Sequence, residues 1–477
     1  MPSLLILIPL LTIVVLNLLK KAMARKAAPW AAGALFLLQI ALAIGRSSSF
    51  WNIQLDPLRN YFIFRYLIDD VSYVMFLAIG IVGWVVLGAG CHAIANEKRR
   101  FNFINLLLFI LIGMNAIVLV ADLFSSYVFL EVTAVAAFIL IAIQNERLAL
   151  EGAFKYIILS AIASVMMLTS LALLLFVAGE TSFVAIKAAL AGSSGSLYVR
   201  LAMGLFICGL FIKGGLVPFH GWLPDAYSAA PTYVSVLLAG IVTKVSGVYV
   251  LIRLMISVFG FTPLVQNVLM AVGALSIIVG ALATFVQSDF KRMLAYSSVS
   301  QVGYIVLALG AGTKLAVAAA VFHLFNHAIF KSLLFVNAAA VEERLGSTDM
   351  DYMGGLASRM PLTGATSVIG LLSTAGIPPL SGFWSKFIII LALWTSGNRA
   401  YAVIALLASI LTLGYFLSMQ RRVFFGKVVH KGLEDVREAS FAYVFPAIVL
   451  AAIAVGVGLF FPWILNWFIL PVQNVVR

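Results

Sequence analysis

Apolar residues fill most of the chain in runs of about 20 residues, the length that a helix needs to cross the hydrocarbon core of a membrane. Short polar segments separate these runs. The pattern predicts an all-α polytopic membrane protein with about 14 transmembrane helices. The predicted spans cover residues 3–19, 28–45, 69–94, 101–120, 122–144, 153–178, 198–218, 231–257, 262–286, 293–312, 315–340, 362–395, 400–420 and 441–470.

Two connections differ from the short loops. Thr181–Leu190 is short and amphipathic, which is typical of a segment that lies at the membrane interface. Residues 46–68 form an aromatic-rich, partly polar connection. The first apolar run has no positive charge before it, unlike a cleaved signal peptide, so we interpret it as an uncleaved first helix.

Composition and charge agree with a membrane protein. The 477 residues are 63% hydrophobic and 10% charged, whereas soluble domains carry about 25% charged residues. The net charge of +13 does not indicate nucleic-acid binding, because the cations lie in short loops. Eighteen of the 31 lysines and arginines follow odd-numbered spans, and nine lie on the other side. The positive-inside rule then predicts a multi-pass protein of the cell (inner) membrane with both termini on the outer side.

The two cysteines, Cys91 and Cys208, are isolated in apolar surroundings. Two separate thiols are too few to hold an iron–sulfur cluster or a zinc ion. We therefore expect no cofactor, no metal and no catalytic redox centre in this chain.

The remaining four of the 31 lysines and arginines are lysines that lie inside predicted spans. The first of them, Lys213, lies just before a helix break. On insertion scales, a lysine inside a membrane span raises the free energy of membrane insertion by about 2.5–3.5 kcal/mol. Lys213 therefore marks a functional site. Pro218 frees backbone groups that only a protein interior or a wet cavity can satisfy. His220 and Asp225 are candidates to line this break or to cap a helix fragment.

Glu131 lies about a third of the way along the fifth span, and Lys213 is its candidate partner, because opposite charges favour both ionised forms. The alternative is a static ion pair that fixes helix packing. Lys244 lies in the middle of the eighth span, about 20 Å from its start, which is too deep for easy snorkelling to the interface.

The eleventh span contains HLFNHAIFK, which places His323, His327 and Lys331 on one helical face. Histidines titrate near neutral pH and pass protons from either ring nitrogen, so a proton path is the favoured interpretation. A structural pair and a metal site are the alternatives, although no third ligand is evident.

A second break precedes Lys386, where Pro378 and Pro379 interrupt the twelfth span. Unwound backbone there is expected to face a cavity. Charged residues near span ends are interpreted differently: Asp289, Lys291 and Arg292 as a turn that sets topology, and Glu342, Glu343 and Arg344 as a solvated loop.

Four segments together resemble one family. They are GLFIKGGLVPFHGWLPDAYSAAPTYVSVLLAGIVTKVSGVYVLIR, SDFKRMLAYSSVSQVGYIVL, FHLFNHAIFKSLLF and STAGIPPLSGFWSKF. They resemble the antiporter-like subunits of respiratory complex I, membrane-bound hydrogenases and multisubunit sodium/proton antiporters, most closely the D-type antiporter subunit. The resemblance implies fourteen core helices with two inverted five-helix repeats, broken at the seventh and twelfth spans.

The resemblance also implies roles and boundaries. It assigns the proton path to Glu131, Lys213, Lys244, His323, His327, Lys331 and Lys386. It divides the chain into N-terminal helices (1–120), an antiporter-like core (121–425), and a loop with the last helix (426–477). The chain lacks the long lateral-helix extension of the largest members, and Lys386 stands where the middle complex I subunit of this type usually has glutamate.

These features predict a proton-translocating subunit of a multisubunit membrane complex. The resemblance implies other antiporter-like and small membrane subunits as partners, and in redox-linked members a hydrophilic arm with iron–sulfur clusters. This chain would then be a non-redox membrane subunit of a sodium/proton antiporter, a hydrogenase or an NADH- or ferredoxin-linked oxidoreductase. A purely structural subunit and a stand-alone secondary transporter are the alternatives.

Overall fold

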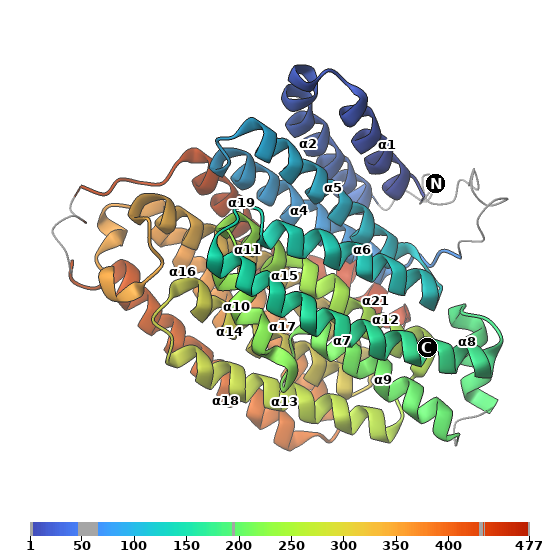
Figure 1. Cartoon of the computed structure of the whole chain (residues 1–477). Helices are drawn as coiled ribbons and strands as arrows, with labels where there is room; N and C mark the ends of the chain where they lie inside the picture. Colours follow the sequence, from blue (N-terminus) through green and yellow to red (C-terminus); the bar gives the residue numbers. More distant parts are fainter. Residues whose placement is uncertain (1–2, 46–64, 193–195, 429–432, 434, 476–477) are drawn as a thin grey trace. The chain divides into compact units, whose positions relative to one another are not determined.

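A computed structural model describes residues 3–45, 65–192, 196–428, 433 and 435–475. Helices make up nearly all of this part of the chain (Figure 1), and extended pairing in it is limited to three isolated antiparallel bridges. The all-α polytopic class is therefore confirmed. Most of the predicted 46–68 connection, residues 46–64, lies outside the described residues.

The chain divides into two compact units. Within the described residues, each unit consists of two separate stretches, and these stretches alternate along the chain. Unit 1 consists of Met1–Gly214 and Ile241–Phe261, and unit 2 of Gly215–Gly240 and Thr262–Val476. The helices of unit 1 are α1 (Leu4–Leu18), α2 (Lys21–Gly45), α4 (Asp70–Ala93), α5 (Glu97–Leu119), α6 (Leu123–Ile141), α7 (Arg147–Ala178), α8 (Phe183–Gly192), α9 (Leu197–Gly214), the π-helical segments Lys244–Tyr249 and Met255–Phe259, and α12 (Val250–Leu254).

Unit 2 contains the longest buried helices. Its elements are α10 (Trp222–Ala229), α11 (Thr232–Leu237), α13 (Pro263–Phe285), α14 (Phe290–Gly310), α15 (Lys314–Leu345), α16 (Pro361–Ala375), α17 (Ser381–Thr395), α18 (Arg399–Gln420), α19 (Phe441–Leu459), α20 (Phe461–Ile464), α21 (Leu470–Val475), the 3-10 turns Phe219–Gly221, Met350–Tyr352 and Leu356–Ser358, and the π-helical segments Arg421–Phe425 and Leu465–Ile469. A further π-helical segment, Leu238–Val242, contains one of the points where the two units meet in sequence, between Gly240 and Ile241.

Each of the predicted spans coincides with a helix or with a run of consecutive helices. Twelve described helices are long and apolar enough to cross a membrane, and Leu4–Leu18, Phe183–Gly192 and Ser381–Thr395 are shorter apolar helices. The count of fourteen spans is therefore not confirmed. The expectation of a single last span over 441–470 is wrong, because α19 ends at Leu459, just before Pro462.

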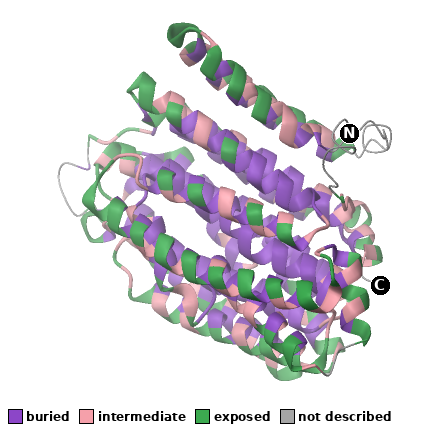
Figure 2. Cartoon of the chain, turned by 45° about the vertical axis from the view of Figure 1, so that its right-hand side comes forward, coloured by how far each residue is buried: buried purple, intermediate pink, exposed green. Residues whose placement is uncertain are grey.

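Figure 2 shows helices that are buried along almost their whole length and helices that have exposed residues along one side. In α15 every residue from Ala316 to Val341 is buried, although the helix carries polar side chains. By contrast, α7 exposes a row of large apolar residues that includes Phe154, Ile158 and Val165. Large apolar side chains on an exposed helix face, and polar side chains within a buried helix, are each expected in a protein that spans a membrane.

The same local motif fixes one helix start in each unit. In unit 1, Asp122 caps α6 by accepting from the Ser125 amide (2.7 Å) and from the Thr181 hydroxyl (2.5 Å). In unit 2, Asp289 caps α14 and accepts from the Arg292 amide and the Thr348 hydroxyl. Each aspartate forms an antiparallel bridge to a residue 60 positions later. This recurrence indicates an internal duplication of the chain.

Both predicted breaks occur where a helix meets a left-handed glycine. After α9, Gly215 has φ +68°, and after α16, Gly376 has φ +85°. Side chains rarely adopt this conformation, so glycine permits the helix to stop there. A cis X–Pro bond follows in each case, at Val217–Pro218 and at Pro378–Pro379.

Candidate functional site

In unit 1, a buried ion pair joins α6 and α9. The Lys213 ammonium lies 3.0 Å from the Glu131 carboxylate, and the Lys213 side chain is 2% exposed, against 31% for Glu131. Two hydroxyls of α7 complete the pair: Ser164 donates to Glu131 (2.6 Å), and Ser160 accepts from Lys213 (3.0 Å). The ammonium therefore has two polar partners in an otherwise apolar region.

The segment that carries Lys244 packs against α9, the helix that carries Lys213. Its segment crosses α9 with the backbones in direct contact, since a Cβ added to Gly247 would lie 2.4 Å from the Gly214 Cα atom. The Lys244 ammonium is fully buried and donates to the neighbouring Thr243 hydroxyl at 3.1 Å. Glycines at the crossing thus bring the segments of the two lysines together.

Unit 1 contains a second ionic group, which the sequence analysis did not identify. Arg253 is 3% exposed and donates to both carboxylate oxygens of Asp69, at 2.5 and 2.8 Å. It also donates to Ser72 and to Tyr249, whose hydroxyl donates to the Val118 carbonyl. Burial alone would raise the pKa of Asp69, but the guanidinium and the hydrogen bonds around the carboxylate lower it below its usual value. Arg253, which sequence position suggests to be a cation at a span end, is an interior residue.

In unit 2, Lys386 and His323 lie around one tyrosine. The Lys386 ammonium is 4.5 Å from the centre of the Tyr304 ring, and the His323 ring centre is 5.9 Å from the same ring. His323 Nδ1 is 2.8 Å from the Ser385 hydroxyl, one residue before Lys386. Helices α14, α15 and α17 thus each contribute to one buried polar cluster.

His327 and Lys331 continue along the buried face of α15. The Lys331 ammonium donates to the Leu294 carbonyl (3.1 Å) and to the Ser297 hydroxyl of α14. The His327 ring packs against Phe330 with centres 5.3 Å apart. No group of three or more His, Cys, Asp or Glu side chains suited to a metal ion occurs within the residues that the structure describes.

Residues at the first break have structural partners. Asp225 lies in the first turn of α10 and accepts from Arg292 at 2.7 Å. His220 is half-buried in the short turn after Pro218, with its ring 6.3 Å from Tyr296. This ion pair is neither of the two roles considered for Asp225, and lining the break stays a prediction.

One expectation about span-end charges is wrong, since residues 342–344 lie in the last turns of α15 and not in a loop, whereas the topology-setting role of residues 289–292 stays a prediction. Lys291 lies in the first turn of α14 and is 5% exposed, and its ammonium is 3.1 Å from the Glu342 carboxylate. Glu342 belongs to the last turns of α15 and also accepts from the Thr232 hydroxyl. These residues form a partly buried ionic cluster because the helices extend further than their apolar runs.

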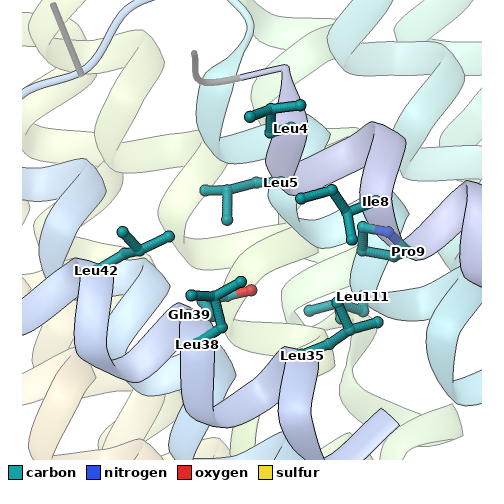
Figure 3. A pocket seen from close by; sticks show the side chains of 9 residues that line it. All are labelled: Leu4, Leu5, Ile8, Pro9, Leu35, Leu38, Gln39, Leu42 and Leu111. Carbon is teal, nitrogen blue, oxygen red and sulfur yellow. The ribbon is translucent and has the colours of Figure 1, made fainter. Parts of the chain in front are cut away.

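A small cavity in unit 1 is unrelated to these charges (Figure 3). It measures about 60 Å³ and lies among α1, α2 and α5. Its lining is apolar apart from Gln39, whose amide bonds to Asn115 and to the Phe76 carbonyl. Without an ionisable side chain, this cavity is no candidate for ion transfer.

Six buried residues of the predicted proton path, together with the partly exposed Glu131, divide into two sets, here called the buried sets, one in each unit. The first consists of Glu131, Lys213 and Lys244, and the second of His323, His327, Lys331 and Lys386. Hydroxyls and carbonyls from neighbouring helices contact most of them. Groups of this kind can hold and release protons without a metal or an organic cofactor.

Comparison with known proteins identifies the family. Residues 120–412 match the family described as "NADH:quinone oxidoreductase/Mrp antiporter, TM". The chain belongs to this family. The match covers all seven residues of the two buried sets.

Individual members of the family are similar over most of their length. The chain is 34% identical to the D-type Na(+)/H(+) antiporter subunit of Alkalihalophilus pseudofirmus, over 76% of this chain and 73% of that protein. It is 33% identical to the N-type subunit of the NADH-quinone oxidoreductase of Desulforudis audaxviator, over 87% and 85% of the two chains. A chain of an archaeal membrane-bound sulfane sulfur reductase has the same fold, with a TM-score of 0.88 and 29% identity over 100% of this chain and 97% of that chain.

Proposed function

We propose that this chain is a proton-translocating, antiporter-like subunit of a multisubunit membrane complex. The observation that carries the proposal is the burial of four lysine ammonium groups, at positions 213, 244, 331 and 386, within apolar helices. Ionisable residues at such positions are costly and therefore mark ion pathways. Packing alone does not require so many of them.

The proposed path follows the two buried sets in order. Separating the Glu131–Lys213 pair releases a proton from Lys213 toward Lys244, and the altered charge biases the next group. Residues His323, His327 and Lys331 relay the proton, and Lys386 passes it to the outer side. We propose residues 121–425 as the translocating core, flanked by the helices of 1–120 and by 426–477.

The proposed ion is the proton. Sodium prefers oxygen ligands, and the second set contains imidazoles and ammonium groups instead. One similar protein is named a sodium/proton antiporter subunit, so exchange with sodium elsewhere in the complex is compatible with this proposal.

The proposed setting is a cell (inner) membrane complex, with both termini of this chain on the outer side. Its partners are further antiporter-like and small membrane subunits. The similar chains belong to an antiporter, a quinone oxidoreductase and a sulfur reductase, which supports a multisubunit setting. A hydrophilic arm with iron–sulfur clusters is proposed only for a redox-linked complex.

Substitution of Lys213 tests the function. In the reconstituted complex, Lys213→Ala is expected to abolish proton transport into vesicles, measured with a pH-sensitive dye, while assembly of the complex stays normal. Lys187→Ala is the matched control, because Lys187 is exposed on the short helix α8 and belongs to neither buried set. Undiminished transport by an assembled Lys213→Ala complex would refute the proposal.

A further inference from the structure

The internal duplication gives each residue of α7 a counterpart in α15. Both helices contain 32 residues, and both end at a left-handed glycine, Gly179 after α7 and Gly346 after α15. The separation in sequence between these glycines equals the separation between the capping residues Asp122 and Asp289. One constant shift in numbering therefore relates α6 and α7 to α14 and α15.

One face of α7 corresponds to the face of α15 that carries ionisable residues. With the constant shift, three pairs of residues correspond: Tyr156 with His323, Ser160 with His327, and Ser164 with Lys331. Steps of four residues keep each group on one side of its helix. Tyr156 is buried and packs edge-on against Phe138 of α6, with ring centres 6.3 Å apart. This face of α7 therefore points toward α6, the helix of Glu131.

The two copies of the duplicated region place ammonium and hydroxyl groups on different helices. In unit 1 the cation is Lys213 of α9, and Ser164 of α7 donates to Glu131 of α6. In unit 2 the cation is Lys331 of α15, and it donates to Ser297 of α14. A donor at the same position of α7 and of α15 thus reaches the preceding helix in both copies. The contact that Ser164 makes is therefore part of the repeated architecture and does not depend on the lysine of α9.

Two serines of α7 contact the two ions of the Glu131–Lys213 pair separately. Ser160 accepts from the Lys213 ammonium at 3.0 Å, and Ser164 donates to Glu131 at 2.6 Å. Lys213 and Ser164 bond to the same carboxylate oxygen, Oε1. When the direct contact between the ions breaks, Ser164 still donates to this oxygen, and Ser160 still offers an acceptor to the ammonium.

Separation of the pair needs such partners. The Lys213 side chain is 2% exposed, so bulk water does not replace the lost carboxylate. A buried charge that loses its partner is strongly destabilising. Hydrogen bonds to charged groups are roughly twice as strong as those between neutral groups. Hydroxyls beside both ions therefore lower the free energy of the separated state, through which proton release from Lys213 passes.

We propose that Ser160 and Ser164 are positioning residues of the proton path, which hold the Lys213 ammonium and the Glu131 carboxylate when the two ions separate. This role rests on the proposed function, because it concerns the first step of that path. In a purely static role, the serines would complete the ion pair and contribute to stability alone. The two roles differ in what happens to transport when the hydroxyls are removed and the direct ion pair is kept.

The first test measures proton transport by the assembled complex in proteoliposomes. Ser160→Ala combined with Ser164→Ala is expected to slow transport at least about tenfold, which corresponds to about 1.4 kcal/mol in the barrier. Ser170→Ala is the matched control, because Ser170 is also buried in α7 and also bonds to α9, at the Ala202 carbonyl (2.6 Å). If the double variant does not assemble, Ser164→Ala alone gives the test, since Ser164 is only half-buried. Transport at the full rate would overturn the positioning role.

The second test separates the hydroxyl group from the shape of the side chain. Ser160→Thr with Ser164→Thr keeps both hydroxyls and adds volume. Ser160→Cys with Ser164→Cys keeps the shape, but a thiol is a weak hydrogen-bonding group. The threonine variant is expected to transport and the cysteine variant to be as slow as the alanine variant. Failure of the threonine variant, or full transport by the cysteine variant, would contradict a role for the hydroxyls.

Comparison with Lys213→Ala distinguishes failure of this role from failure of the proposed function. If Lys213→Ala abolishes transport while the double alanine variant transports normally, Lys213 remains on the path and the positioning role is refuted. If an assembled Lys213→Ala complex transports normally, the proposed function is refuted, and the positioning role is refuted with it.

Discussion

Replacing Glu131 by glutamine should separate the structural contribution of its ion pair from its contribution to transport. The attraction between two unit charges 3.0 Å apart is about 5 kcal/mol at an effective dielectric constant near 20. Glu131 is 31% exposed, so solvent screening reduces this value. Leaving a buried charge without its partner typically costs about 3–5 kcal/mol. We therefore expect Glu131→Gln to lower the unfolding free energy by about 3 kcal/mol, the lower end of that range.

The double variant Glu131→Gln with Lys213→Met removes both charges. An apolar side chain of similar length in place of a buried cation restores stability to within about 1 kcal/mol, because no uncompensated charge remains. Transport is not expected to return, since Lys213 is the proposed proton carrier. A pair that only braces helices predicts recovery of both properties.

The assay combines two measurements on the same purified complex. Denaturant unfolding in mixed micelles gives the change in stability, and proton uptake into proteoliposomes gives transport. Glu151→Gln is the matched control, because its pair with Lys155 (2.8 Å) lies on the exposed face of α7 and contributes about 0.5 kcal/mol or less. Transport by the double variant, or an unchanged stability of Glu131→Gln, would refute the reasoning.

Two further predictions concern unit 1. The Asp69 pKa is lowered in the folded protein, so its pairing with Arg253 stabilises the fold above the ordinary carboxyl pKa of about 4, and this contribution is lost as the pH falls through the lowered value. Asp69→Asn should therefore be less stable at pH 7 and show a weaker acid dependence of unfolding; an unchanged acid profile would contradict this. Gly247→Ala should cost at least about 1–3 kcal/mol, because the new Cβ would meet the Gly214 backbone at 2.4 Å. A variant with normal melting temperature and transport would show that the crossing tolerates a methyl group.

The sequence was sufficient for most of the fold because the apolar runs are long and their interruptions are chemically distinct. The breaks follow Gly215 and Gly376, where glycine and proline occur together. The end of the last long helix at Leu459 was not predicted, although Pro462 follows it, because the residues around this proline are as apolar as the helix itself. Hydropathy identifies residues that tolerate lipid, and it does not distinguish a continuous helix from several short ones.

The buried lysines were evident from the sequence, whereas their partners were not. A lysine within an apolar run is conspicuous, but Ser160, Ser385 and Tyr304 resemble ordinary residues of any span. Arg253 and Lys291 lie near span ends, where a cation usually sets topology. Their burial depends on acidic partners 184 and 51 positions away, which no local pattern reveals.

The stretches of the two units alternate along the chain, and this order constrains how the protein can be inserted into the membrane during synthesis. Ribosomal synthesis delivers the chain from its N-terminus, yet unit 1 lacks residues 241–261 until the first stretch of unit 2 has already been inserted. The helices before residue 214 therefore cannot complete unit 1 until residues 241–261 have been inserted. A gene divided after residue 214 would yield a first product that lacks residues 241–261 of unit 1 and a second product that contains all of unit 2, so the early helices must wait in the bilayer until the later segment arrives.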